Sequence, residues 1–183
     1  MKGYILYQTY KIINNKPTVL LFGKLENSQS FLTLNSYTPY FYIKASDAKH
    51  LPKDYSSKPS KFKNFKSKKL VQVLMDVPAD APKLRKYLEK EDVECYEADI
   101  KFPQRFLIDN KIKTFIEIPD GDYEDSDVID RIYQEPTLSP AEPFSPNLKV
   151  FSIDIETSKN AEDLYSLSIY SKKFQTSLLI SKK

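Results

Sequence analysis

Two carboxylates, Asp154 and Glu156, stand two positions apart within residues 150–157. Apolar and polar residues alternate there, which predicts a β-strand with Ile153 and Ile155 on one face. Asp154 and Glu156 then share the other face, roughly 7 Å apart along the strand. Such a pair of hard oxygen ligands suits a divalent metal ion that assists phosphodiester hydrolysis. The spacing alone fits equally well the solvated outer face of an edge strand.

A second candidate is the polar segment from Pro52 to Lys69, where lysines are interleaved with Phe62 and Phe65. Ammonium groups attract phosphates and phenylalanine rings can stack on bases, so a loop here could follow a nucleic-acid strand. The lysines assigned to this nucleic-acid contact are Lys58, Lys61, Lys63, Lys66, Lys68 and Lys69. The alternative is a solvated loop whose two aromatic side chains pack against the domain, since lysine contacts carry no sequence information.

Charge is distributed unevenly along the chain, although the formal net charge is only +3. Residues 1–70 contain 13 lysines and three acidic residues, whereas residues 91–165 contain 19 acidic and seven basic residues. The basic part could face nucleic-acid phosphates. The acidic part could equally be a solvated linker that repels itself, so charge alone does not identify the partner.

The single cysteine, Cys95, cannot form an internal disulfide, which fits a reducing compartment. Its position in a stretch expected to form a strand, residues 93–96, favours a packing role over a reactive one. No apolar run approaches the roughly 18 residues of a membrane span, and the N-terminus has no signal-peptide pattern. We therefore expect a cytoplasmic protein with no membrane partner.

The pattern along the chain predicts an α+β fold with a β-rich N-terminal domain. From Tyr40 onward the order strand, helix, strand, helix, strand is typical of a ferredoxin-like element. Residues 120–135 are acidic and rich in turn formers. The expected strands are residues 4–13, 18–25, 30–34, 40–43, 69–77, 93–96 and 114–118, and the expected helices are residues 46–50, 80–90 and 103–109.

A proline-rich stretch predicts a domain boundary. Residues 136–146 contain four prolines, too many for a helix or a central strand. The chain is therefore expected to consist of a domain at residues 1–146 and a second unit at residues 147–183. Three short antiparallel strands are expected in the second unit, near residues 149–157, 164–170 and 174–180.

Two segments together resemble family B DNA polymerases. Residues 152–157, Ser-Ile-Asp-Ile-Glu-Thr, are similar to the first exonuclease motif of that family. Residues 96–109, Tyr-Glu-Ala-Asp-Ile-Lys-Phe-Pro-Gln-Arg-Phe-Leu-Ile-Asp, are similar to a segment that the family carries upstream of this motif. The strand at residues 40–43 also resembles part of the family's N-terminal domain. The glycine-poor N-terminus and the sequence Glu-Ala-Asp-Ile at residues 97–100 are most similar to the bacterial DNA polymerase II branch.

The resemblance implies a fold and an activity. Residues 1–146 would be the polymerase N-terminal domain, near the template strand, and residues 147–183 would begin an RNase H-like 3′–5′ exonuclease domain. The implied function is template-directed DNA synthesis with proofreading, in DNA replication or repair, on a DNA primer–template and deoxynucleotides. Asp154 and Glu156 would be catalytic residues and ligands of Mg²⁺. Some family members sense template uracil through a pocket in this domain, and the sequence identifies no residues for one here.

The chain would then be an N-terminal fragment of a longer enzyme, because the remaining exonuclease and polymerase carboxylates lie outside it. We expect such a fragment to be inactive and to bind Mg²⁺ weakly. The uncovered sheet at residues 147–183 is expected to pack on the N-terminal domain or to form a homodimer with a second copy. One alternative is a non-catalytic nucleic-acid-binding module that uses the basic half. A free-standing nuclease is disfavoured because only one acidic motif is present.

For Arg105, the only arginine between residues 86 and 130, two interpretations stand beside each other. Its aromatic and acidic neighbours in the sequence favour a structural ion pair, because a guanidinium forms planar, bidentate contacts with carboxylates. Contact with DNA is the alternative.

Overall fold

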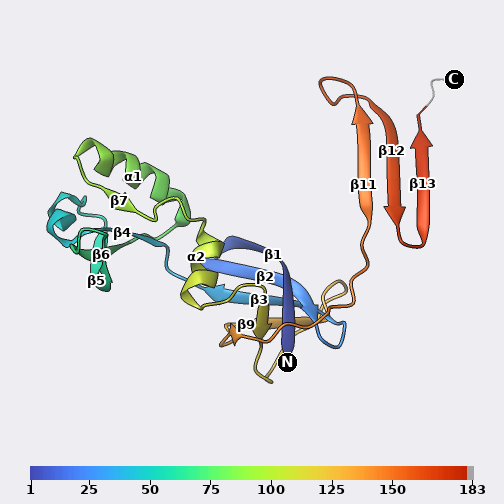
Figure 1. Ribbon diagram of the computed structural model, residues 1–183, viewed down its shortest axis with the longest axis horizontal. Coiled ribbons are helices and arrows are strands. Elements are labelled where there is room, and N and C mark those ends of the chain that lie inside the picture. The colour runs from blue at the N-terminus through green and yellow to red at the C-terminus, as the bar shows by residue number, and fades with distance from the viewer. Residues whose placement is uncertain (181–183) are drawn as a thin grey trace. The chain divides into compact units, whose positions relative to one another are not determined.

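The chain folds into two compact units, Met1–Pro146 and a second unit that begins at Asn147. This computed structural model describes residues 1–180 (Figure 1). The unit boundary lies at the end of the proline-rich stretch. None of the helices in the described part of the chain has the length and apolar character of a membrane-crossing segment.

A six-stranded sheet forms the larger part of the first unit, in the order β10-β8-β1-β2-β3-β9. The strands β1, β2 and β3 form two consecutive antiparallel hairpins. Asn14 and Asn15 close the first hairpin with φ angles of 48° and 61°, a conformation that asparagine tolerates and a two-residue hairpin requires. The strands are β1 (Lys2–Ile13), β2 (Lys16–Leu25), β3 (Ser30–Ser36), β8 (Phe115–Glu117), β9 (Arg131–Gln134) and β10 (Ser139–Pro140).

The strand β9 was not predicted from its acidic, turn-rich surroundings. It pairs in parallel with β3, with Tyr133 opposite Thr33. Side-chain hydrogen bonds secure the strand at both ends: Ser30 donates to Asp130, and Ser36 donates to Glu135. Acidic residues flanking the strand therefore help to dock it.

A second, four-stranded antiparallel sheet has the order β5-β6-β4-β7. The helix α1 (Ala81–Lys90) connects β6 to β7, so the β-rich α+β class is confirmed. Two short 3₁₀ helices, η1 (Ala45–His50) and η2 (Pro78–Asp80), complete this part of the unit. The strands are β4 (Tyr40–Lys44), β5 (Ser56–Lys63), β6 (Lys69–Leu74) and β7 (Cys95–Tyr96).

The prediction of a lysine-rich loop up to Lys69 was wrong over residues 56–63, which form the strand β5. This strand lies at the edge of its sheet, and nearly all of its side chains are exposed. Lysines keep their hydration on such an edge, and Pro59 is tolerated there because an edge strand leaves some N–H groups unpaired.

Two hydrophobic cores hold the first unit together. The helix α2 (Phe102–Asp109) buries Phe102 and Phe106 against the first sheet, in a cluster that includes Phe31. The helix α1 buries Leu84 and Leu88 against the second sheet, in a cluster with Phe41, Ile43 and Val73. Each sheet is therefore covered by one helix (Figure 1).

The second unit is a sheet of three consecutive antiparallel strands, close to the residues predicted from the sequence. Ile153 lies opposite Ile169, and Ile155 lies opposite Leu167, so one face is apolar. Ile153 and Ile155 are nevertheless 64% and 55% exposed. The strands are β11 (Ser152–Thr157), β12 (Leu164–Ser171) and β13 (Phe174–Leu179).

Candidate functional site

The acidic pair lies on β11, on the face opposite the isoleucines. Asp154 is opposite Ser168 and Glu156 is opposite Ser166 on β12. Ser168 in turn exchanges a hydrogen bond of 2.9 Å with Ser177 on β13. The two carboxylates are exposed and stand among hydroxyl groups, on a polar sheet face.

The donor chemistry of this face suits Mg²⁺, which takes oxygen ligands and often binds through one or two carboxylates while keeping several waters. Within residues 1–180, however, no cluster of three histidine, cysteine, aspartate or glutamate side chains could hold a metal ion. Asp154 and Glu156 therefore offer part of a ligand set, and their role as metal ligands stays a prediction.

The six predicted nucleic-acid-binding lysines lie on a single hairpin, which is formed by β5 and β6. Three lie on β5, two in the turn and one at the first residue of β6; in chain order they are Lys58, Lys61, Lys63, Lys66, Lys68 and Lys69. All six are exposed, and within residues 1–180 none of them is in an ion pair. The hairpin therefore presents uncompensated positive charge to solvent.

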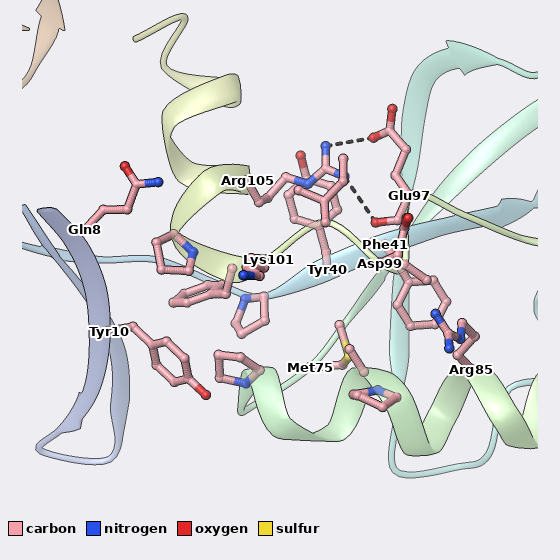
Figure 2. Close-up of a pocket in the computed structure, with 18 of the residues that line it drawn as sticks. Gln8, Tyr10, Tyr40, Phe41, Met75, Arg85, Glu97, Asp99, Lys101 and Arg105 are labelled. Carbon is pink, nitrogen blue, oxygen red and sulfur yellow. Dashed lines mark hydrogen bonds and ion pairs between the residues drawn. The ribbon is translucent and has the colours of Figure 1, made fainter. Parts of the chain in front are cut away.

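A pocket with a volume of about 570 Å³ opens in the first unit where the two sheets meet (Figure 2). Strands β1 and β4, the start of α1 and the segment before α2 all contribute to its wall. The apolar part of the wall includes Pro39, Phe41, Met75, Ile100 and Phe102. Its size is within the usual range for small-molecule sites. Sequence reasoning missed this pocket because its residues converge from segments far apart in the chain.

Arg105 lies beside this pocket and forms the ion pair that its neighbours predicted. Its guanidinium is 2.7 Å from the Glu97 carboxylate and donates a second bond, 3.3 Å long, to the Glu97 carbonyl (Figure 2). The charged group also stands over the rings of Tyr40 and Tyr42, 5.1 and 5.8 Å from their centroids. Burial alone would lower the pKa of Arg105, but Glu97 outweighs it and the pKa is raised.

Asp109, at the end of α2, accepts hydrogen bonds from the hydroxyl groups of Tyr37 and Tyr40. Burial, followed by these bonds, raises the pKa of both tyrosines, because a phenolate would be desolvated and would face a carboxylate. This tyrosine–carboxylate cluster ties α2 to the start of the second sheet. Only the general resemblance of residues 96–109 to a known segment pointed to this region.

Comparison with known proteins gives consistent results. Residues 93–173 match the model of the DNA polymerase family B exonuclease domain. A DNA polymerase from Methanocaldococcus jannaschii is 32% identical over 131 residues, covering 59% of this chain and 8% of that protein. The structure of the family B DNA polymerase from the hyperthermophilic archaeon Pyrobaculum calidifontis superposes with a TM-score of 0.78 at 21% identity, covering 99% of this chain.

The chain spans only 27% of that matched structure. The family match includes Arg105 on α2 and Asp154 on β11, so it extends across both units. The nearer likeness to bacterial DNA polymerase II stays a prediction. Part of the chain is thus similar in sequence to family B DNA polymerases, and the chain has the fold of the matched part of one of them.

Proposed function

We propose that the chain is the N-terminal part of a DNA-directed DNA polymerase with 3′–5′ proofreading exonuclease activity. The observation that carries this proposal is the family match over residues 93–173, which joins the Arg105 segment to the acidic strand. A DNA primer–template and deoxynucleotides are the proposed partners. Residues 1–146 would be the N-terminal domain, and the exonuclease domain would begin near residue 147.

Asp154 and Glu156 are the proposed metal ligands and catalytic residues of the exonuclease. Both lie on one face of β11, so the two carboxylates would offer oxygen ligands on the same side of the sheet. A bound metal ion there would stabilise negative charge on phosphate oxygens and activate water. In the pairing of β11 with β12, both carboxylates lie on the face that carries Ser166 and Ser168.

Metal titration tests this assignment on the chain itself. We expect weak Mn²⁺ binding, measured by the loss of the free-ion signal in electron paramagnetic resonance, and we expect Asp154→Asn with Glu156→Gln to remove it. A matched control is Asp125→Asn with Asp127→Asn, because these carboxylates are also two residues apart and exposed. Equal binding by the wild-type chain and the Asp154/Glu156 variant would contradict the assignment.

The 183-residue chain is expected to lack both activities, since two carboxylates do not complete a two-metal site. Incubation with a labelled primed template, deoxynucleotides and Mg²⁺ or Mn²⁺ should give neither extension nor trimming. Trimming that disappears in the Asp154/Glu156 variant would show that the chain is a nuclease on its own.

A second candidate function, nucleic-acid binding without catalysis, is favoured by the exposed lysines of the β5–β6 hairpin. Phosphate contacts of this kind predict weak binding that is indifferent to sequence and falls steeply with salt. Charge reversal at Lys61, Lys63, Lys66, Lys68 and Lys69 should abolish most of it in a gel-shift assay. Binding that survives both high salt and charge reversal would exclude the hairpin as the contact.

The pocket of Figure 2 is a proposed site for an unpaired template base, which follows the resemblance to family members that sense uracil. Its apolar walls suit a flat ring, and Arg105 stands at its edge. A test is the comparison of single strands that differ only by uracil or thymine. Equal affinity for the two strands would contradict uracil sensing.

Homodimer formation through residues 147–183 also stays a prediction. The apolar face of β11–β13 is the surface that two copies would bury. Light scattering of the whole chain and of residues 1–146, over a range of concentrations, tests it. A monomeric whole chain at every concentration would contradict it.

A further inference from the structure

Phe65, in the turn between β5 and β6, is fully exposed to solvent. The turn around it is well organised. The Asn64 side chain accepts hydrogen bonds from the backbone N–H groups of Lys66 and Lys68, at 3.0 and 2.9 Å. It also donates to the Tyr96 hydroxyl on β7, at 2.9 Å. A structured turn thus holds an aromatic ring in water, where it contributes nothing to the core.

A pocket with a volume of about 520 Å³ lies next to this turn. Four of the twelve residues in its wall are aromatic: Tyr42 from β4, Phe62 from β5 and Tyr96 from β7, together with Phe65 itself. The rings of Tyr42 and Phe62 meet edge to face, with centroids 5.9 Å apart. Phe62 is 51% exposed, so part of its side chain is accessible to a ligand.

The charges around this pocket favour an anionic ligand. Glu97 and Asp109 line it, but Arg105 neutralises the first and two tyrosine hydroxyls hydrogen-bond to the second. Glu94, which accepts a hydrogen bond from Tyr96, is paired with Lys44. None of the hairpin lysines is in an ion pair within residues 1–180, and the ammonium of Lys61 lies 5.4 Å from the centroid of the Phe62 ring. Aromatic faces surrounded by free lysines are the combination that single-stranded nucleic acids bind.

We propose that this aromatic pocket is a base-binding site for single-stranded nucleic acid. Phe65 stacks on one unpaired base, the wall formed by Phe62 and Tyr96 receives its neighbour, and the hairpin lysines contact the phosphates between them. Every base can stack on an aromatic ring, so the site binds a single strand irrespective of its sequence. The site is separate from the pocket of Figure 2, although the Arg105–Glu97 ion pair lines both.

The proposal rests on the lysine–phosphate contact proposed above, and the experiment separates the two. The whole chain is titrated into a fluorescently labelled 12-nucleotide single-stranded DNA and into an abasic strand of equal length, with anisotropy as the readout. The two strands carry the same phosphates and differ only in their bases. Tyr87→Ala is the matched control, because Tyr87 is an exposed aromatic residue on α1 of the same unit.

We expect Phe65→Ala to weaken binding of the base-containing strand by about tenfold, the effect of one lost base stack. Binding of the abasic strand, the salt dependence and the melting temperature should not change, and Tyr87→Ala should match the wild-type chain. Phe62→Ala should weaken binding of the base-containing strand as well.

Equal affinity of the wild-type chain for the two strands would overturn the base site, as would absence of binding to both. If reversal of the lysine charges removes binding and Phe65→Ala does not, the phosphate contact stands and the base site is wrong. An effect of Phe65→Ala that is equal on the two strands would likewise exclude stacking.

Discussion

Both units place apolar side chains at alternate positions of a strand, but in different surroundings. In the first unit, Phe41 and Ile43 on β4 are 1% and 0% exposed because α1 covers their sheet. In the second unit, Ile153 and Ile155 on β11 are more than half exposed although their strand is fully paired with β12. Hydrogen bonding therefore defines both sheets, whereas buried apolar area stabilises only the first.

This difference teaches that alternation in a sequence specifies a strand and its faces, but not whether a face is buried. The covering element is a separate stretch of chain, and its contribution to stability is large because burial dominates folding. Experiments on matched positions in the two units can test this conclusion directly.

The largest contrast is expected in native-state hydrogen exchange. Amides of β12 should exchange at least about a hundredfold faster than amides of β2, because each opening of the second unit exposes little additional apolar area. Mass spectrometry of peptic fragments after timed exchange measures both strands in one sample. Equal protection of the two central strands would show that the second unit is stabilised by contacts of its own.

The next largest contrast is expected when an isoleucine is shortened to alanine, which should destabilise the first unit more than the second. Ile43→Ala should cost about 2–5 kcal/mol of unfolding free energy, since it removes a fully buried side chain from a packed cluster. Ile155→Ala, the same change on an exposed sheet face, should cost less than about 1 kcal/mol. Urea denaturation measures both costs, with tyrosine fluorescence as the signal for Ile43→Ala and circular dichroism as the signal for Ile155→Ala. Similar costs at the two positions would contradict the comparison.

A smaller loss of stability is expected from substitution of Gly23, where the strands β1 and β2 of the first unit approach closely. A Cβ atom at Gly23 would lie 2.1 Å from the Tyr4 carbonyl oxygen and 2.4 Å from the Phe31 ring. Gly23→Ala should therefore cost about 1–3 kcal/mol, as other overpacked cores do. Gly121→Ala is the control, because nothing lies within 4 Å of a Cβ there. A neutral Gly23→Ala would mean that β1 and β2 can separate at little cost.

The smallest effect is a pH dependence confined to the first unit. The pKa values of Tyr37 and Tyr40 are raised in the folded state by burial and by Asp109. The unfolded chain therefore loses these protons first, so their stabilisation is complete below pH about 10 and is lost as the pH rises further. The urea midpoint should fall above that pH, and Tyr40→Phe should make the fall shallower. An identical pH profile for this variant would exclude the tyrosine cluster as the cause.

Most strands and both α-helices followed from local pattern, because alternation, turn residues and helix periodicity act over a few positions. The two strands that were not predicted, β5 and β9, both depend on pairing with a partner strand. The strand β5 carries lysines and a proline, and becomes a strand only because β6 supplies a pairing edge. The strand β9 depends on β3, about 100 positions earlier.

The candidate sites divide in the same way. Asp154 and Glu156 could be found from spacing, since both lie on one short strand. The hairpin lysines could be found from composition, although not their arrangement on paired strands. The two pockets could not be found, because their walls combine residues far apart in the chain, such as Gln8 with Arg105 and Tyr42 with Asp109. The ion pair of Arg105 with Glu97 could be predicted because the two residues are close together in the sequence.

The strand β8 has a consequence for how such a protein can be divided. It lies between β1 and β10 in the first sheet, so Gly3 at the start of the chain is opposite Ile116. A gene segment limited to the family match at residues 93–173 would encode β8 without β1. Chain divisions near residue 147 should therefore give pieces that fold, whereas divisions near residue 93 should not. The family match begins at residue 93, in the middle of the first folding unit.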